Sequence, residues 1–129
     1  MIVTNLARNT IVADAMEVAE TASQKVKGLL GREGLEEGTG LLFKGAGSLH
    51  TLFMRFPIDI IYTDKQGKVV KTAIAVRPFK LVAAPLRCYY ALELPAGAIA
   101  ASNTQVGDQL EFAEEVEAED EDHLAEAAG

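Results

Sequence analysis

The sequence predicts a mainly β (α+β) domain, a compact antiparallel barrel or sandwich of about seven short strands with one helix packed on it. Segments rich in β-branched and aromatic residues recur between polar turns that contain glycine. Only one segment ahead of the C-terminal tail has clear helical periodicity. The strands therefore do not alternate with helices, as they would in a parallel βαβ fold.

The single helix is predicted over residues 21–31. Thr21 and Gln24 have the spacing of a capping box, in which each side chain bonds the other's backbone N–H group. Apolar side chains follow at helical spacing on one face, and Gly31 stands where a left-handed C-cap is needed.

The strands are predicted in order at residues 2–5, 10–13, 41–43, 50–54, 58–62, 68–76, 89–94 and 108–112. Residues 64–67 form a polar hairpin turn that ends in Gly67. In the longest strand, alternation places Val70, Thr72, Ile74 and Val76 on one face. Residues 95–103 have room for a short helical turn.

Charge divides the chain into a folded domain, residues 1–112, and a tail, residues 113–129. The first part carries all 12 Lys and Arg and 11 of the 19 acids, a net charge of +1, whereas the tail has a net charge of −8. A segment with so few apolar residues is expected to be disordered or a transient helix. We expect a solubilising extension; the alternatives are an interaction arm and an intramolecular mimic of an anionic ligand.

Composition excludes several classes of protein. A lone cysteine, Cys88, allows neither an internal disulfide nor a cysteine-built metal centre. The sequence shows no membrane-length apolar stretch and no secretory signal, so we expect a cytoplasmic protein. The sequence does not indicate an oligomeric state, and we favour a monomer. Scattered basic residues predict no nucleic-acid binding, and no glycine-rich loop or metal-ligand spacing indicates a cofactor.

Five motifs resemble the prokaryotic domain-of-unknown-function 192 (DUF192) family. They are Gly28-Leu29-Leu30-Gly31-Arg32, Gly40-Leu41-Leu42-Phe43, the run from His50 to Asp59, Leu92-Glu93-Leu94-Pro95-Ala96-Gly97 and Val106-Gly107-Asp108. The resemblance covers nearly all of residues 1–112 and implies a compact β-rich domain, but no activity. Many members are exported, and others have Trp where Phe53 stands here.

Asp59 is the strongest candidate for a functional residue because it interrupts the apolar run of residues 57–61. A carboxylate placed there needs a partner, and Arg55 lies four residues earlier. The pair is expected either to bind an anionic ligand, with Asp59 orienting it or acting as a base, or to lock a turn in which Asp59 accepts backbone N–H bonds.

Glu93 stands between two leucines, so strand alternation predicts an exposed side chain. If that face lines a cleft, Glu93 and Asp59 would form a carboxylate pair suited to acid–base chemistry. His50 is expected either to add a general base or only to satisfy its hydrogen bonds within a strand. Arg32 is expected either to add a second cation at the rim of the site or to complement the dipole at the helix C-terminus.

These residues favour a small, non-catalytic ligand-binding or accessory domain with a polar cleft at His50, Arg55, Asp59, Glu93 and Arg32. A hydrolase or lyase that uses Asp59 and Glu93, or His50, as acid and base is the first alternative. A protein-interaction module, which needs an exposed apolar patch, is the second.

Overall fold

The computed structural model describes residues 1–18, 34–45, 49–50, 56–78 and 81–114, with only the backbone described at 49–50 and 81–82. The helix predicted at 21–31 and the tail beyond residue 114 lie outside these residues. No helix within the described part of the chain is long and apolar enough to cross a membrane.

The described residues are predominantly strands, which confirms the β-rich class. The elements are β1 (Ile2–Asn5), β2 (Thr10–Ala13), β3 (Ala15–Val18), β4 (Thr39–Lys44), β5 (Leu49–His50), β6 (Ile58–Thr63), β7 (Val69–Val76), β8 (Leu81–Val82), β9 (Tyr90–Pro95), α2 (Ala98–Ser102) and β10 (Leu110–Ala113). The short helical turn expected within residues 95–103 is α2.

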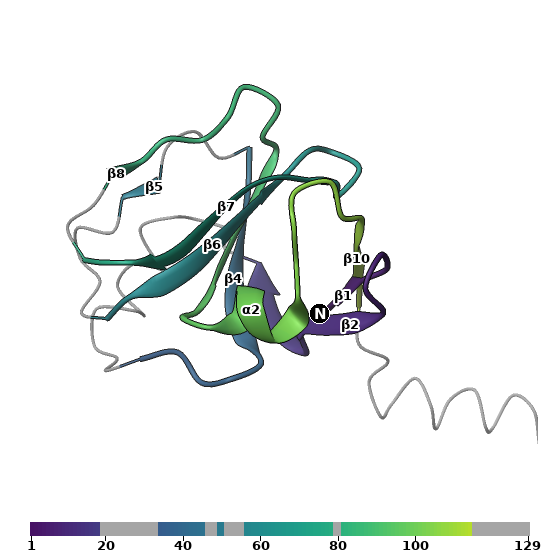
Figure 1. Cartoon of the computed structure of the whole chain (residues 1–129), viewed down its shortest axis with the longest axis horizontal. Coiled ribbons are helices and arrows are strands. Elements are labelled where there is room, and N and C mark those ends of the chain that lie inside the picture. The colour runs from purple at the N-terminus through teal and green to yellow at the C-terminus, as the bar shows by residue number, and fades with distance from the viewer. Residues whose placement is uncertain (19–33, 46–48, 51–55, 79–80, 115–129) are drawn as a thin grey trace, which may run out of the picture.

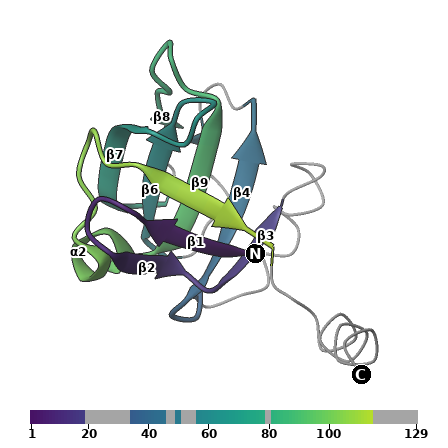
Figure 2. The same cartoon turned by 90° about the vertical axis from the view of Figure 1, so that its right-hand side faces the viewer.

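The strands form three sheets (Figure 1). The largest has the order β3-β4-β9-β6-β7, the second has the order β10-β1-β2, and β5 pairs with β8 alone. In Figure 2 the three-stranded sheet crosses one face of the five-stranded sheet. The described strands form an open, sandwich-like arrangement and do not close into a barrel.

One pairing differs from the antiparallel expectation, because β3 runs parallel to β4. Strand β3 was not predicted, because its residues Ala-Met-Glu-Val lack the β-branched enrichment of the other strands. β2 and β3 are separated by Asp14 alone, and the chain passes there from the small sheet to the large one.

Two apolar clusters cover the two faces of the large sheet. The first lies between the sheets, where Val3, Val12 and Leu110 of the small sheet pack with Ile61 and Leu92 of the large one. The second lies on the opposite face and contains Leu41, Phe56, Ile58, Ile60, Tyr62 and Ala91. Strand β6 is buried along its whole length because it contributes to both clusters.

Strand β7 departs from the alternation expected of it. Ile74 is 64% exposed, whereas Val69, which precedes the predicted stripe, is fully buried. The register between β6 and β7 shifts near Ile58, and Ala75 has a positive φ of 49°. The shift turns this edge strand, so its alternate residues do not share one buried face.

Candidate functional site

Asp59 is the second residue of β6 and is completely buried. Its Oδ1 atom accepts a hydrogen bond from the Ala75 backbone N–H at 2.8 Å. Its Oδ2 atom accepts bonds from Gly97 N–H at 3.1 Å and Ile99 N–H at 3.0 Å. Both carboxylate oxygens are therefore used to hold backbone, as expected for the structural role of this residue.

The Gly97 and Ile99 bonds make Asp59 the cap of α2. The residue at the N-cap position itself is Gly97, at φ 100°, and it has no side chain with which to cap the helix. A carboxylate from β6 thus accepts N–H groups of the first helical turn and ties the helix to the large sheet. Arg55, the predicted ion-pair partner, lies outside the described residues, so that pairing stays a prediction.

Glu93 is only 4% exposed, so the expectation of an exposed side chain is wrong. The alternation rule assumes that one face of the sheet meets solvent, but β9 is the central strand of a sheet that is covered on both faces. Among the residues that the structure describes, none gives the Glu93 carboxylate a hydrogen bond or an ion pair. Burial raises the pKa of Glu93 to about 7.

Two other titratable groups accompany Glu93 in the second apolar cluster. Burial raises the pKa of Tyr62 to about 12, and the neighbouring Cys88 and Glu93 add to that rise. Burial also raises the pKa of the Cys88 thiol, whose Sγ donates to the Tyr90 carbonyl at 3.4 Å. In each of these groups burial favours the neutral form over the charged one.

Asp59 and Glu93 lie on opposite faces of the large sheet. Asp59 is paired with Leu94, and Glu93 with Ile60 on the adjacent strand. Residues directly opposite each other across two strands share a face, and successive residues alternate. The two side chains thus do not form the carboxylate pair that acid–base chemistry across one cleft would need.

The other predicted site residues lie largely outside the described part of the chain. The backbone of His50 is in β5, paired with Leu81, while Arg55 and Arg32 fall in segments that are not described. Their joint role in a ligand site stays a prediction. Within the described ranges, no group of three or more His, Cys, Asp or Glu side chains is placed to hold a metal ion.

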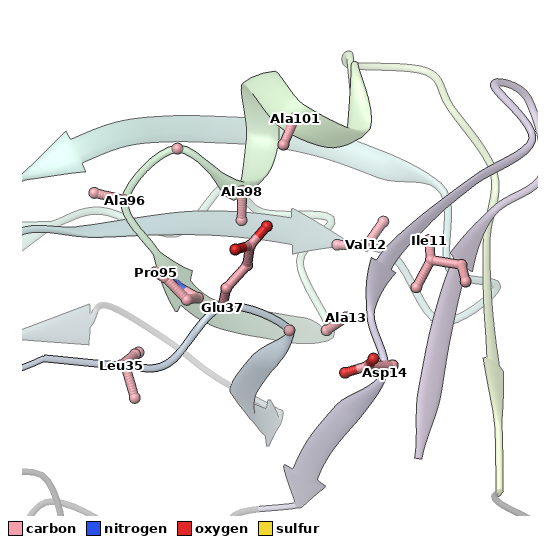
Figure 3. A pocket seen from close by; sticks show the side chains of 12 residues that line it. Ile11, Val12, Ala13, Asp14, Leu35, Glu37, Pro95, Ala96, Ala98 and Ala101 are labelled. Atoms are coloured by element: carbon pink, nitrogen blue, oxygen red, sulfur yellow. The ribbon is translucent and has the colours of Figure 1, made fainter.

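A groove of about 830 Å³ opens beside α2, and none of its lining residues was among the predicted site residues. Its volume is within the range of small-molecule sites. Figure 3 shows the lining, which comes from the β2–β3 junction, the 35–38 turn and the β9–α2 connection. The lining residues are Ile11, Val12, Ala13, Asp14, Leu35, Glu37, Gly38, Pro95, Ala96, Gly97, Ala98 and Ala101.

Backbone contacts fix the walls of this groove relative to one another. The Gly38 carbonyl accepts bonds from Asp14 N–H at 3.0 Å and Ala15 N–H at 2.9 Å. Gly38 has a φ of 85°, and a Cβ atom there would lie 2.5 Å from Asp14 Oδ1. The opposite wall is held because Asp59 caps α2 and because Thr10 Oγ1 donates to the Ser102 carbonyl at 2.7 Å.

Asp14 and Glu37 are the charged side chains among the described residues of the lining. In Figure 3 both carboxylates point toward the groove, beside an aliphatic floor that includes Val12, Ala13 and Ala98. The site is thus negatively charged above an apolar base. In the sequence, Asp14 and Glu37 are loop acids with no local signature, and only the fold brings them together.

A family model described as "Uncharacterized ACR", DUF192, matches residues 3–112. The chain belongs to the DUF192 family. The match contains every described residue of the groove and ends within β10. The predicted family resemblance is therefore confirmed, and the family's description states no activity.

Curated relatives of this DUF192 chain are archaeal proteins named UPF0127. One from Pyrococcus furiosus is 35% identical over 65 residues, which cover 50% of this chain and 55% of that protein. One from Thermococcus sibiricus is 25% identical over 119 residues, covering 89% of this chain and 75% of that protein. The chain thus spans just over half the length of the first relative.

Two solved structures share the fold of this DUF192 chain. A protein of unknown function from Novosphingobium aromaticivorans has a TM-score of 0.72 and 23% identity, covering 86% of this chain and 82% of that one. A putative transcription regulator from Sinorhizobium meliloti has a TM-score of 0.71 and 22% identity, covering 85% and 89%. At these identities the likeness establishes the β-rich fold alone.

Proposed function

We propose that this DUF192 domain is a non-catalytic binding domain for a small organic cation, such as an alkylammonium or alkylguanidinium group, and that the groove beside α2 is its site. The observation that carries the proposal is the pairing of two inward-facing carboxylates, Asp14 and Glu37, with an aliphatic floor. A cationic head between the carboxylates and an alkyl body on the floor match both parts of the site.

Rigid walls support binding. The site is assembled from three separate segments, and hydrogen bonds to Gly38, Gly97 and Ile99 hold their backbones in place. A preformed site loses less conformational entropy when a ligand binds, which favours affinity. The sequence predicted an anionic ligand, bound by the cations Arg55 and Arg32. The groove is lined instead by the carboxylates of Asp14 and Glu37, which favour a cationic ligand.

The described lining offers little for catalysis. Its polar side chains are the two carboxylates, with no hydroxyl, thiol, imidazole or amine among the residues that the structure describes there. The residue with a near-neutral pKa, Glu93, belongs to the second apolar cluster rather than to this lining. An acid–base reaction needs its groups around one reacting atom, so the groove favours binding over chemistry.

The test is an NMR titration of the full chain with hexylammonium and, in parallel, with hexanoate. We expect hexylammonium to shift the backbone amides of Ala13, Gly38 and Ala98 in a saturable way at millimolar concentration, as suits a ligand of about seven heavy atoms. Hexanoate, which has a similar alkyl chain and the opposite charge, should leave them unmoved.

Three neutralising variants complete the test. Asp14→Asn and Glu37→Gln should each weaken hexylammonium binding by about two- to tenfold, the effect of losing one partly exposed ion pair. Glu36→Gln removes the same charge from an exposed neighbour outside the lining, so it should keep the affinity nearly unchanged. Equal binding of hexanoate, or equal affinity in all three variants, would overturn the proposal.

A further inference from the structure

A second groove, of about 600 Å³, lies on residues that the proposed site does not use. It is bordered by the β6–β7 turn, the start of β7, the segment before β9 and the loop that follows α2. Its lining residues are Asp64, Lys68, Val69, Val70, Pro85, Leu86, Arg87, Val106 and Gly107.

Two large aliphatic side chains stand out to solvent at this groove. Leu86 is fully exposed, and Val106 is 61% exposed. Both border the same groove, where Val70 and Pro85 extend the apolar surface. Exposed aliphatic side chains that line one concave surface are typical of an interaction site.

The charged side chains at this groove, Lys68, Arg87 and Asp64, have a net positive charge. Lys68 and Arg87 are exposed, and no described residue forms an ion pair with either; the ion pair within the described part of the chain joins Arg8 to Asp108. The acid of the lining, Asp64, uses its Oδ1 atom to accept the N–H groups of Gln66 and Lys68 at 2.9 Å, and its charge offsets one of the two cations. The open surface therefore matches a segment that carries both carboxylates and aliphatic side chains.

The chain itself contains such a segment. Residues 115–129 hold seven acids, no Lys or Arg, and the isolated aliphatic residues Val116 and Leu124. We propose that this acidic segment docks on the second groove of its own chain, with carboxylates at Lys68 and Arg87 and an aliphatic side chain against Leu86 and Val106. The proposal gives the tail an interaction role, which is the alternative to a solubilising extension.

The start of the segment is within reach of the groove. Gln109 pairs with Lys68 at the edge of the groove, and β10 ends at Ala113, four residues further on. Four extended residues span about 14 Å, so about five residues of the segment suffice to return to the groove. The remaining ten residues of the segment are then free to occupy the groove. Because the segment is covalently tethered, its effective concentration at the groove is about millimolar, which favours even a weak contact.

The test is zero-length carbodiimide cross-linking of the full chain at low ionic strength, with mass spectrometry of the products. This reagent joins a lysine amine to a carboxylate only when the two are in direct contact. We expect Lys68 to be joined to acids of residues 115–126 within one chain. Lys44, which is exposed and lies outside the groove, is the internal control and should give little product.

Two variants of exposed residues make the result specific. Arg87→Glu places a like charge beside the segment and should lower the Lys68 product about two- to fivefold, as expected for lost surface ion pairs. Leu86→Ser should lower it as well, by removing the aliphatic contact. A Lys68 yield no higher than that of Lys44, a yield unchanged in both variants, or products found only between two chains would overturn the proposal.

Discussion

Asp59 Oδ1 accepts a hydrogen bond from the backbone N–H of Ala75 at 2.8 Å, across a stretch of 16 residues. Ala75 has a positive φ of 49°, a conformation that costs energy for a residue other than glycine. The bond to a buried carboxylate stabilises this turn of β7, while the other oxygen of Asp59 caps α2. One side chain thus joins the edge of the large sheet to the wall of the groove.

Replacing Asp59 with alanine should therefore lower the free energy of unfolding strongly. The variant leaves the buried N–H group of Ile99 and the part-buried N–H groups of Ala75 and Gly97 without their acceptor, for which we expect a cost of about 2–4 kcal/mol. Chemical denaturation of the two full chains measures the difference. Asp59→Asn keeps the volume but has one acceptor oxygen, so it should fall between alanine and the native residue.

Asp64→Ala is the matched control for Asp59. This carboxylate also accepts two backbone N–H groups, from Gln66 and Lys68, but it does so in an exposed turn where water replaces it. We expect a loss below about 1 kcal/mol. Equal losses at the two positions would contradict the structural role of Asp59.

The predicted pairing of Asp59 with Arg55 has its own test. If the two side chains interact, the double alanine variant should lose clearly less stability than the two single variants together, with a coupling of about 0.5–3 kcal/mol. Denaturation of the four chains of the cycle measures this coupling. Additive losses would show that the backbone donors alone account for Asp59.

Glu93→Gln should change how stability depends on pH. Burial raises the pKa of Glu93 to about 7 in the folded chain, from 4.5 for an ordinary glutamate. Between these two values the folded state binds more protons than the unfolded state, so the free energy of unfolding falls as pH rises. Glutamine cannot ionise and removes this fall, so the variant should be more stable than the native chain by about 2–3 kcal/mol at pH 8, with little difference at pH 4.

Thermal or chemical unfolding at several pH values between 4 and 8 tests this prediction. Glu111→Gln is the control, because Glu111 lies on β10 with its side chain exposed. It should give a curve parallel to that of the native chain. A Glu93→Gln curve that is also parallel would show that Glu93 ionises in the folded state as easily as in the unfolded one.

Asp108 should produce the opposite dependence at acid pH. Its hydrogen bonds with Arg8 at 3.0 Å and Asn5 at 3.0 Å lower the pKa of Asp108 to about 2. A lowered carboxyl pKa contributes stability that is complete above about 4 and is lost as pH falls through 2. Asp108→Asn should cost about 1–3 kcal/mol at pH 6, and the difference should shrink as pH approaches 2. An acid titration of stability for both chains measures this change.

Local patterns predicted most strands of the fold. β1, β2, β6 and β9 were expected from alternation or continuous apolar runs, and each is found within one or two residues of its predicted bounds. β3 was missed because its four residues carry no strong strand preference and gain their hydrogen bonds from β4, which lies more than twenty residues further along the chain. Such a pairing is decided by the assembled sheet rather than by the segment.

The candidate site was less predictable for the same reason. An acid in an apolar run indicated a buried, partnered carboxylate at Asp59, and the structure provides the partners as backbone donors from two distant segments. Alternation misplaced Glu93 because a single strand does not reveal whether one or both faces of its sheet are covered. Asp14 and Glu37 gave no signal, since isolated loop acids are usually solvated.

Gly38→Ala should test whether close backbone contact shapes the proposed groove. Gly38 has a φ of 85°, and the added Cβ would lie 2.5 Å from Asp14 Oδ1, so both strain and collision oppose it. We expect a loss of about 1–3 kcal/mol in unfolding free energy. Gly45→Ala is the control, because Gly45 also has a positive φ, of 63°, but its Cβ would meet nothing within 4 Å. The smaller loss of stability in Gly45→Ala measures the cost of a positive φ alone. The additional loss in Gly38→Ala is due to the collision with Asp14, so it should become smaller when Asp14→Ala is combined with Gly38→Ala. Chemical denaturation measures the free energy of unfolding of each variant. Equal losses in Gly38→Ala and Gly45→Ala would show that Asp14 does not press against the 35–38 turn.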